Sequence, residues 1–399
     1  MISEEGFRLR VREFLEAHAP KRDARDSNSA TVMDVARAQA FQKALYEAGL
    51  AGLSWPKEYG GQGFDERFQT IFNDEASSYD LPTGPFIVAF GMSLPTILAL
   101  GTEAQKQRYV PPAIRGEEMW CQLFSEPSAG SDLAGVRSSV VRDGDEWVLN
   151  GQKVWTTGAH FAQHALLLAR TDFDAPKHAG LSMFILDMSS PGISIRPLRQ
   201  MTGEADFNEV FFDDVRIPAG AILGEPGDGW RCATTLLMNE RILASTESAE
   251  KTDRLAAVAT HLRLARARGL LADQAVRQSI MDLVVRYWAA DLLGVRQRQL
   301  LAGGGVPGPE GSLNKLGAAI LDKRSAAVAF RLSGPEGTAW ACEDSLGATA
   351  AHELLSAPLM SIAGGSNQIV RNLLAERVLG LPKEPGFDKQ TPFRDLPFS

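Results

Sequence analysis

The fold is decided between residues 120 and 226, where the chain reads EWVLNGQKVW (146–155), HALLLAR (164–170), LSMFILDM (181–188), GISIRPL (192–198) and NEVFFDDVRI (208–217). The period of apolar residues is near two here, and turn-forming residues separate the segments. EWVLNGQKVW is predicted to form two short strands joined at Asn150-Gly151, the dipeptide that favours a type I′ turn. No helix-length pattern intervenes, so we expect a compact antiparallel β-barrel or sandwich.

The sequence on either side of this β region has helical patterns. Before it, FQKALYEAGL (41–50) places apolar residues on one stripe at helical spacing. After it, the same period predicts helices at 230–268, 273–302, 314–333 and 366–379. The tail after Pro382 is rich in proline and is predicted to be irregular.

These patterns predict an α+β protein of three domains, at residues 1–118, 119–227 and 228–399. The 399 residues suffice for two or three domains with a large buried core. The order of helices, strands and helices contains no βαβ unit, which argues against a Rossmann dinucleotide-binding fold.

Composition and charge exclude several classes of function. The net charge of -8 argues against a nucleic-acid partner, because phosphates need clustered lysines and arginines. No apolar run is long enough to predict a membrane span, and residues 1–20 lack the apolar core of a signal peptide. The cysteines Cys121, Cys232 and Cys342 match neither a disulfide framework nor a zinc site, and they indicate a reducing cytoplasm. The histidines show no metal-ligand spacing, so no metal is expected.

Two segments of the β region could bind a ligand, and each also has a structural explanation. FSEPSAGSD (124–132) follows a strand and can present backbone amides and serine hydroxyls to an anion or a ring oxygen. It can equally be a solvated turn in which Ser131 or Asp132 caps a helix. Trp155, which is followed by two threonines up to Thr157, could stack on a planar cofactor or belong to the core.

Glu240 is the most informative carboxylate of the chain. It shares a helical face with apolar residues, namely Trp230, Ala233, Leu237 and Ala244. Burial there would raise its pKa toward neutrality, as a general base for a weak carbon acid requires. The alternative is a glutamate between two helices, paired with an arginine. Further on, IAGGSNQ (362–368) is either a backbone turn that a ligand approaches closely or a plain loop before a helix capped by Ser366.

Together these segments resemble the acyl-CoA dehydrogenase family over nearly the whole chain. The matching motifs follow in family order and spacing: GLAGLSWPKEYGGQG (49–63), FSEPSAGSDLAGV (124–136), LNGQKVWTTGA (149–159), NEVFFDDVRIP (208–218), GEPGDGW (224–230) and IAGGSNQIVRNLLAERVLGLP (362–382). The resemblance implies an N-terminal α domain, a middle β-barrel domain and a C-terminal four-helix bundle. It also implies an FAD cofactor and an acyl-CoA substrate.

The resemblance assigns roles to individual residues of this chain. Flavin contacts are implied for Gln122, Phe124, Ser125, Gly130, Ser131, Trp155 and Thr157. Of these, Trp155 and Thr157 are expected against the isoalloxazine ring, with Thr157 near N5, and Ser131 is also expected near the CoA. Arg241 matches an arginine that follows the corresponding helix position in the family. Substrate contacts are implied for Ser131, Arg241, Gly364 and Gly365.

The catalytic base is expected in one of two places. Most family members have a glutamate in a Tyr-Glu-Gly-Thr turn before the last helix, where this chain has Gly364. A minority, similar to isovaleryl-CoA and long-chain acyl-CoA dehydrogenases, have it on the long helix, where this chain has Glu240. The resemblance therefore implies that Glu240 takes the α-proton while the β-hydride passes to flavin N5, giving the trans-2-enoyl-CoA. The backbone N–H of Gly364 and a flavin ribityl hydroxyl are expected to bind the thioester oxygen.

Two segments depart from the family pattern. ARARGLLAD (265–273) and CEDSLGATAAHE (342–353) stand where the family has Arg-x-x-Phe-Gly and Gln-x-x-Gly-Gly-x-Gly motifs that reach a neighbour's FAD. This predicts an α2β2 heterotetramer with a paralogous subunit, or a homotetramer in which Arg266 or Arg268 substitutes. The reduced flavin is expected to pass electrons to an electron-transfer flavoprotein. The open alternatives are an oxidase on the same scaffold and a flavin-binding, non-catalytic or half-active partner subunit of a heteromeric acyl-CoA dehydrogenase.

Overall fold

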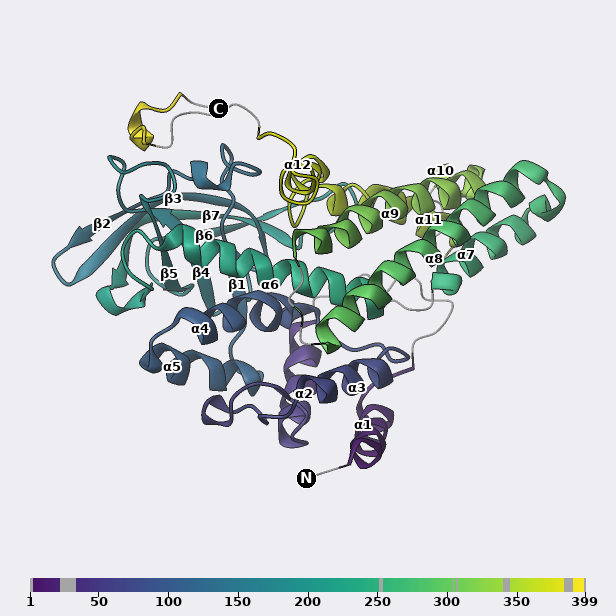
Figure 1. The fold of residues 1–399 in the computed structure, drawn as a ribbon, viewed down its shortest axis with the longest axis horizontal. Coiled ribbons are helices and arrows are strands. Elements are labelled where there is room, and N and C mark those ends of the chain that lie inside the picture. The colour runs from purple at the N-terminus through teal and green to yellow at the C-terminus, as the bar shows by residue number, and fades with distance from the viewer. Residues whose placement is uncertain are drawn as a thin grey trace. The chain divides into compact units, whose positions relative to one another are not determined.

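The computed structural model describes residues 3–21, 34–250, 254–303, 305, 308–339, 345–383 and 390–397, without the side chains of 241–250, 254–257, 298 and 301–302. The chain divides into two compact units. Unit 1 comprises Met1–Pro20, Thr31–Glu240 and Pro385–Ser399, and unit 2 comprises Lys21–Ala30 and Arg241–Glu384. The predicted order of helices, strands and helices is confirmed (Figure 1). The predicted three-domain boundaries stay a prediction.

Unit 1 begins with helices that pack beside its sheet (Figure 1). Their bounds are α1 Glu4–His18, α2 Val35–Glu47, α3 Glu66–Ala76, α4 Leu94–Leu100 and α5 Glu103–Ile114. Four of them start after a residue whose side chain accepts a hydrogen bond from a backbone N–H of the first turn: Ser3, Asp34, Asp65 and Thr102. Such N-caps satisfy donors that a helix leaves unpaired, so these short polar residues fix where the helices begin.

An 8-stranded sheet follows in the order β6-β7-β3-β2-β4-β5-β8, with β1 paired to β4. The strands are β1 Trp120–Leu123, β2 Ser139–Asp143, β3 Glu146–Thr157, β4 His164–Arg170, β5 Leu181–Asp187, β6 Ile193–Leu198, β7 Phe207–Pro218 and β8 Ile222–Leu223. The expectation of a purely antiparallel sheet is wrong, because β1 and β2 both run parallel to β4. The long connections between these strands permit the parallel pairing, which a short hairpin cannot.

The predicted turn at Asn150-Gly151 is also wrong. The chain turns instead at residues 143–146, and β3 continues through the dipeptide with a bulge opposite β7. There the Asn150 side chain accepts a hydrogen bond from the Asp214 backbone N–H and donates one to the Asp214 carboxylate, both at 2.9 Å. A Cβ atom at Gly151 would lie 2.5 Å from the Ser138 hydroxyl. The two residues therefore serve a bulge and a close strand approach.

The core of unit 1 lies on both faces of the sheet. Along β4, Leu166 and Leu168 contact the helices, while Leu167 and Ala169 face the interior of the curled sheet. All seven residues of β4 are buried, which explains why its sequence reads as one continuous apolar run. The helices and one face of the sheet therefore share a core, and the other face packs a second apolar cluster.

Unit 2 is a bundle of helices around its own smaller core (Figure 1). The helices of the C-terminal part are α6 Gly229–Glu250, α7 Arg254–Ala267, α8 Gln274–Ala302, α9 Ser312–Ser333, α10 Pro335–Ala339, α11 Leu346–Ser356 and α12 Asn367–Arg377. The segment predicted as one helix at 230–268 contains α6 up to Glu250 and α7 from Arg254, and residues 251–253 lie outside the described residues. Helix α11 was not predicted, because its alanine-rich face lacks the long apolar side chains that mark a helical period. No described helix is long and apolar enough to cross a membrane.

The described end of the C-terminal tail, residues 390–397, contains turns and a short 3-10 helix, as the predicted irregular tail requires, and it contacts the rest of unit 1. Phe393 is 3% exposed, and its backbone N–H donates to the Ala175 carbonyl at 3.0 Å. Its ring lies 3.4 Å from the Arg170 guanidinium carbon and 6.0 Å from the Phe173 ring. Residues 390–397 are therefore docked on the segment that follows β4.

Candidate functional site

The predicted cofactor residues of unit 1 come from the end of β1, the loop after it and the end of β3. The backbone N–H of Val154 donates to the Ser125 carbonyl at 2.9 Å, which joins β3 directly to this loop. This hydrogen bond places Ser125 beside Val154, the residue that precedes Trp155. Gln122 is half-buried in β1, and Thr157 is half-buried at the end of β3.

Trp155 is exposed and has an unusual backbone. Its φ is 61°, a value that bulky L-residues rarely adopt. The register between β3 and β7 shifts at Lys153/Thr156, so a second bulge turns the side chain outward and leaves it 61% exposed. The alternative that Trp155 belongs to the core is therefore wrong. A rigidly placed, exposed indole is suited to stack on a planar cofactor.

The loop 124–132 presents open backbone. A turn at residues 126–129 is closed by two backbone hydrogen bonds, of 3.1 and 3.0 Å. Gly130 and Ser131 follow and are exposed, and a Cβ atom at Gly130 would have no neighbour within 4 Å. Asp132 stands before a short 3-10 helix without a side-chain capping bond, and its carboxylate pairs with Lys177. Packing does not require glycine at position 130, so a ligand could approach the backbone there.

Phe124 differs from the other predicted contacts. Its side chain is 4% exposed and packs in the core that the helices and sheet share. Its carbonyl accepts a hydrogen bond from the ammonium of Lys153 at 2.9 Å. Phe124 can therefore shape the loop from behind, and its cofactor contact stays a prediction.

The sequence interpretation missed a buried ion pair behind this loop. Lys153 is fully buried, and its Nζ lies 2.8 Å from the Glu126 carboxylate. Burial lowers the pKa of Lys153 to about 8, although Glu126 acts in the opposite direction. Burial alone would raise the pKa of Glu126, but Lys153 and nearby donors leave it lowered. A period of two counted from Trp147 and Leu149 places Lys153 on the inward face, and this signal could have revealed it.

Glu240 lies near the end of the part of α6 that belongs to unit 1. The helix packs into the unit 1 core through Cys232, Ala233 and Leu236, which are fully buried. Glu240 itself is half-buried, and the preceding Asn239 donates to the Thr96 hydroxyl at 3.2 Å. The side chains of Arg241 and Ala244 lie outside the described residues. The role of Glu240 as a base stays a prediction.

The Gly-Gly turn of unit 2 has the backbone that glycine permits. Gly364 and Gly365 have φ values of 64° and 87°, both in the left-handed region. The predicted cap is confirmed, because the Ser366 hydroxyl accepts from the Ile369 N–H at 3.3 Å. Lys315, which is 8% exposed and was not predicted, donates to the Gly365 carbonyl at 2.5 Å. The turn is therefore fixed from both sides, while its substrate contacts stay a prediction.

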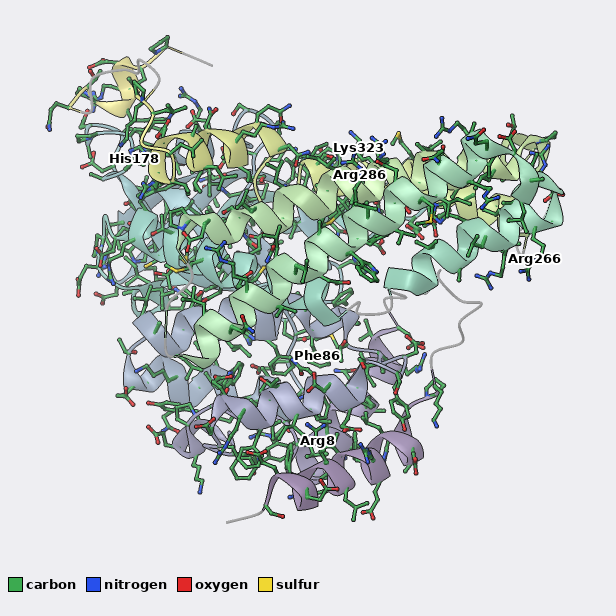
Figure 2. All side chains as sticks on the ribbon, turned by 45° about the vertical axis from the view of Figure 1, so that its right-hand side comes forward. Arg8, Phe86, His178, Arg266, Arg286 and Lys323 are labelled. Carbon is green, nitrogen blue, oxygen red and sulfur yellow. The ribbon has the colours of Figure 1, made fainter. Side chains whose placement is uncertain are left out.

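The two arginines near the altered family motif differ in their surroundings. The Arg268 guanidinium donates to the Leu332 carbonyl at 3.4 Å and lies so close to Gly334 that a Cβ atom there would clash with it. Arg268 thus caps the C-terminus of α9, where a cation is favourable. Arg266 is exposed at the end of α7 (Figure 2). Part of the second altered segment, residues 342–344, lies outside the described residues.

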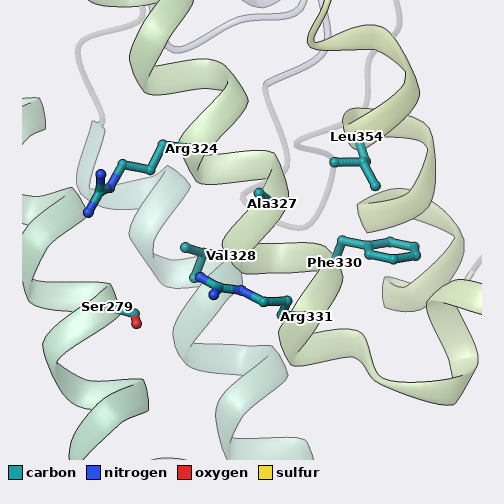
Figure 3. Close-up of a pocket in the computed structure, with 7 residues that line it drawn as sticks. All are labelled: Ser279, Arg324, Ala327, Val328, Phe330, Arg331 and Leu354. Atoms are coloured by element: carbon teal, nitrogen blue, oxygen red, sulfur yellow. The ribbon is translucent and has the colours of Figure 1, made fainter.

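Two surface clefts lie away from the predicted residues. In unit 2, a cleft of about 530 Å³ lies along α9 between α8 and α11 and includes Ser279, Arg324 and Arg331 (Figure 3). In unit 1, a cleft of about 550 Å³ includes Arg108 and His164. Neither cleft includes a residue to which the sequence assigned a role.

Comparison with known proteins gives matches over almost the whole chain. The family model "Acyl-CoA dehydrogenase, N-terminal domain" matches residues 3–117, the middle domain 121–215 and the C-terminal domain 227–379. The acyl-CoA dehydrogenase IpdE1 of Mycobacterium tuberculosis is 37% identical over 354 residues, covering 87% of this chain and 88% of IpdE1. FadE34 of the same organism is 39% identical over 344 residues, which are 86% of this chain and 46% of FadE34, so the chain spans less than half of that relative.

Similar solved structures include complexes of two different chains. The structure named "Tcur3481-Tcur3483 steroid ACAD" has a TM-score of 0.80 and 28% identity, covering 96% of this chain and 98% of that chain. A chain of the ChsE4-ChsE5 complex from Mycobacterium tuberculosis has a TM-score of 0.74 and 27% identity, covering 96% of this chain and 100% of that chain.

Proposed function

The chain belongs to the acyl-CoA dehydrogenase family, and on this basis we propose that it oxidises an acyl-CoA thioester to the trans-2-enoyl-CoA with Glu240 as the base. It is an oxidoreductase of the acyl-CoA dehydrogenase type, and its cofactor is FAD. When bound, FAD supplies the hydride acceptor of the reaction. The predicted acyl-CoA dehydrogenase-like fold is confirmed.

The unit 1 surface fits the flavin in its chemistry. The residues proposed to hold it are Gln122, Phe124, Ser125, Gly130, Ser131, Trp155 and Thr157. An exposed indole supplies an aromatic face, and the open backbone at Gly130-Ser131 supplies N–H donors. Support for this assignment comes from the strained and exposed position of Trp155, since folding alone gains nothing from it.

The position of the base is the observation that carries the proposal. Where most family members have the glutamate, this chain has Gly364 at a φ of 64°, in a region that disfavours a glutamate side chain. The long helix α6 instead carries Glu240, which is half-buried and follows the core residues Ala233 and Leu236 on that helix. A carboxylate withdrawn from water is suited to take a proton from carbon near neutral pH. Glu240 then holds the α-proton.

The Gly-Gly turn is proposed to polarise the substrate. The N–H of Gly364 would donate to the thioester oxygen, and Gly365 and Arg241 would contact the rest of the substrate. Because Lys315 and the Ser366 cap fix the turn, this donor needs little reorganisation during the reaction. Ser131 is proposed to contact the CoA from unit 1.

Glu240→Gln tests the proposed base. The amide keeps the shape of the side chain but cannot take a proton, so we expect activity to fall roughly a thousandfold or more. FAD content and thermal stability should stay at the wild-type level. Glu225→Gln, at an exposed glutamate before α6, is the matched control and should keep full activity. A rate of flavin bleaching by acyl-CoA within tenfold of wild type would show that Glu240 is not the base.

A second proposal concerns assembly. On α8, the side chains of Met281, Val285, Trp288 and Leu292 are 52%, 64%, 62% and 68% exposed, and their spacing places them on one face. An exposed apolar stripe of this kind is typical of a protein interface. We propose that it packs against a subunit of the same family, in an α2β2 heterotetramer.

The heteromer has two supports. Arg268, one of the two candidates to replace the altered family motif, is engaged in capping α9. Two similar structures are complexes of different chains. Expression alone and with a paralogous subunit, followed by mass and flavin measurement, tests the idea. We expect about one FAD per heterodimer. A lone homotetramer with one tightly bound FAD per chain would contradict it.

The same experiment separates the alternative function, a flavin-binding, non-catalytic or half-active partner subunit. If the heteromer carrying Glu240→Gln keeps wild-type activity, the catalytic base belongs to the other subunit. If that heteromer loses activity, this chain provides the base.

An oxidase is distinguished from a dehydrogenase by the rate at which air reoxidises the reduced enzyme. We propose an electron-transfer flavoprotein as the electron acceptor and, because the described cysteines Cys121 and Cys232 are buried free thiols, the cytoplasm as the location.

The acyl group is proposed to carry a bulky ring system. The support is the similarity to the structure named "Tcur3481-Tcur3483 steroid ACAD". Rates with a CoA thioester of a steroid side-chain acid and with a straight-chain acyl-CoA test this. We expect kcat/KM to be at least about tenfold higher for the steroid thioester. A preference for the straight chain would reject the ring system while leaving the dehydrogenation proposal intact.

A further inference from the structure

We propose that the buried pair of Lys153 and Glu126 is a positioning device for the cofactor-facing surface of unit 1. It holds the loop after β1 against the end of β3 and thereby keeps Trp155 in its outward orientation. This inference rests on the proposed flavin contacts of that surface, and it assigns no chemical step to either residue.

Lys153 connects the strand to the loop. Its side chain is fully buried, and its ammonium donates to the Phe124 carbonyl at 2.9 Å and to the Glu126 carboxylate at 2.8 Å. An ammonium group has three donors and no acceptor, and both of these hydrogen bonds are strengthened by its positive charge. The position of the loop backbone at 124–126 therefore depends on the side chain of a residue in β3.

Glu126 connects the two ends of the loop. One carboxylate oxygen accepts from the Arg137 backbone N–H at 2.7 Å, and the other accepts from the Ser138 backbone N–H at 2.9 Å as well as from Lys153. The carboxylate thus closes the segment 127–136, which includes the exposed Gly130-Ser131. Charge-assisted bonds to backbone donors are strong, so this closure is rigid.

The effect reaches Trp155 through the backbone. The hydrogen bond from Val154 to the Ser125 carbonyl lies between the lysine contact and the indole. The next residue, Trp155, has a φ of 61° at a shift of register. A strained backbone persists only where the surroundings fix it on both sides. The buried pair provides that fixation from the loop side.

The electrostatics agree with an ionised pair at neutral pH. The pKa of Glu126 is lowered overall, and that of Lys153, at about 8, is still above 7. Arg170, which is also buried, lowers the pKa of Lys153 and donates to the Ala134 and Val136 carbonyls of the same segment. A buried ion pair adds little net stability compared with apolar residues of similar size. The buried pair of Lys153 and Glu126 is therefore better explained by the fixed loop position that its directional contacts impose than by a gain in stability.

The test uses the full-length holoenzyme and the double variant Lys153→Met/Glu126→Gln. Removing both charges avoids an unpaired buried charge, so the variant should still fold. The Phe124 carbonyl and one of the two backbone N–H groups lose a partner, so its melting temperature should be moderately lower. We expect FAD to bind about tenfold more weakly or worse, and the visible absorption band of the bound flavin to change shape. Neither measurement requires an acyl-CoA substrate.

Arg115→Met/Glu117→Gln is the matched control, because it removes an ion pair of the same unit that lies outside the loop and outside β3. It should leave the FAD affinity and the flavin band unchanged. Wild-type FAD affinity and band shape in a folded Lys153→Met/Glu126→Gln variant would overturn the proposal. This outcome is distinct from failure of the proposed base, because Glu240→Gln alters activity without altering FAD binding.

Discussion

The two units of the chain cover their apolar surfaces in different ways. In unit 1 the helices and the sheet bury residues as distant in sequence as Phe7, Leu166 and Leu236 in one core. Its exposed large apolar residues, such as Leu9 and Trp155, are separate from one another in the sequence. In unit 2 the core is smaller, and α8 exposes a continuous apolar stripe. Unit 1 thus buries its apolar residues in one core, whereas unit 2 leaves an apolar stripe exposed, which we propose is covered by a further subunit.

The two units also differ in how their surroundings affect the ionisation of a buried or half-buried glutamate. In unit 1, Glu126 is paired with Lys153, and its pKa is lowered. In unit 2, burial raises the pKa of Glu353 on α11. Glu126 is therefore stabilised as an anion, whereas the anion of Glu353 is disfavoured.

The largest expected effect is on assembly. Leu292→Glu places a charge at the C-terminal end of the apolar stripe, where the wild-type side chain is 68% exposed. Burying that charge in an interface should weaken subunit association by roughly 2–4 kcal/mol. Light scattering or sedimentation should then show a lower mass at micromolar concentration.

The matched control is Leu9→Glu on α1 in unit 1, where the leucine is 57% exposed and lies on no stripe. It should leave the mass unchanged. If both variants keep the wild-type mass, the stripe on α8 is not an interface, and the contrast between the units loses its main support.

A smaller effect is expected from the tail that docks on unit 1. Phe393→Ala removes a ring that is 3% exposed and packs against Arg170 and Phe173. Loss of such a buried ring costs about 3 kcal/mol of unfolding free energy. Calorimetry should show a lower melting temperature, and proteases should cut the tail more readily.

Leu381→Ala is the control for the tail, because that leucine is 53% exposed and its loss should cost less than about 0.5 kcal/mol. Equal melting temperatures for the two variants would mean that the docked tail does not stabilise unit 1. The shared core of that unit would then be sufficient by itself.

The strands illustrate how far the sequence could predict the fold. Strand β4 has the bounds of the quoted segment HALLLAR, because burial on both faces leaves one uninterrupted apolar run. The Asn150-Gly151 turn failed for a physical reason. The same two residues suit a turn and a bulge, and the choice is made by Asp214 and Ser138, which are distant in sequence.

The candidate site shows the same limit. Motifs located the loop 124–132, Trp155 and the Gly-Gly turn, since each is a local pattern of residue types. The lysines behind them, Lys153 and Lys315, were missed, because a lysine reads as a surface residue until a partner on another element is known. Local patterns thus identify candidate ligand-binding segments, whereas the contacts that hold those segments in place depend on the fold.

The smallest expected effect is a gain of stability in unit 2. Glu353→Gln replaces a carboxyl whose pKa is raised, first by burial and then by Asp322, while His261 and His352 act in the opposite direction. In the wild type, the folded state holds the Glu353 proton more tightly than the unfolded state. That contribution is complete below the unfolded pKa of about 4.3 and is lost as the pH rises through the folded pKa. The variant should therefore gain up to about 1 kcal/mol at pH 7 and nothing at pH 4. A Glu353→Gln protein that is less stable at pH 7 would show that the anion is paired, and that unit 2 holds buried charge as unit 1 does.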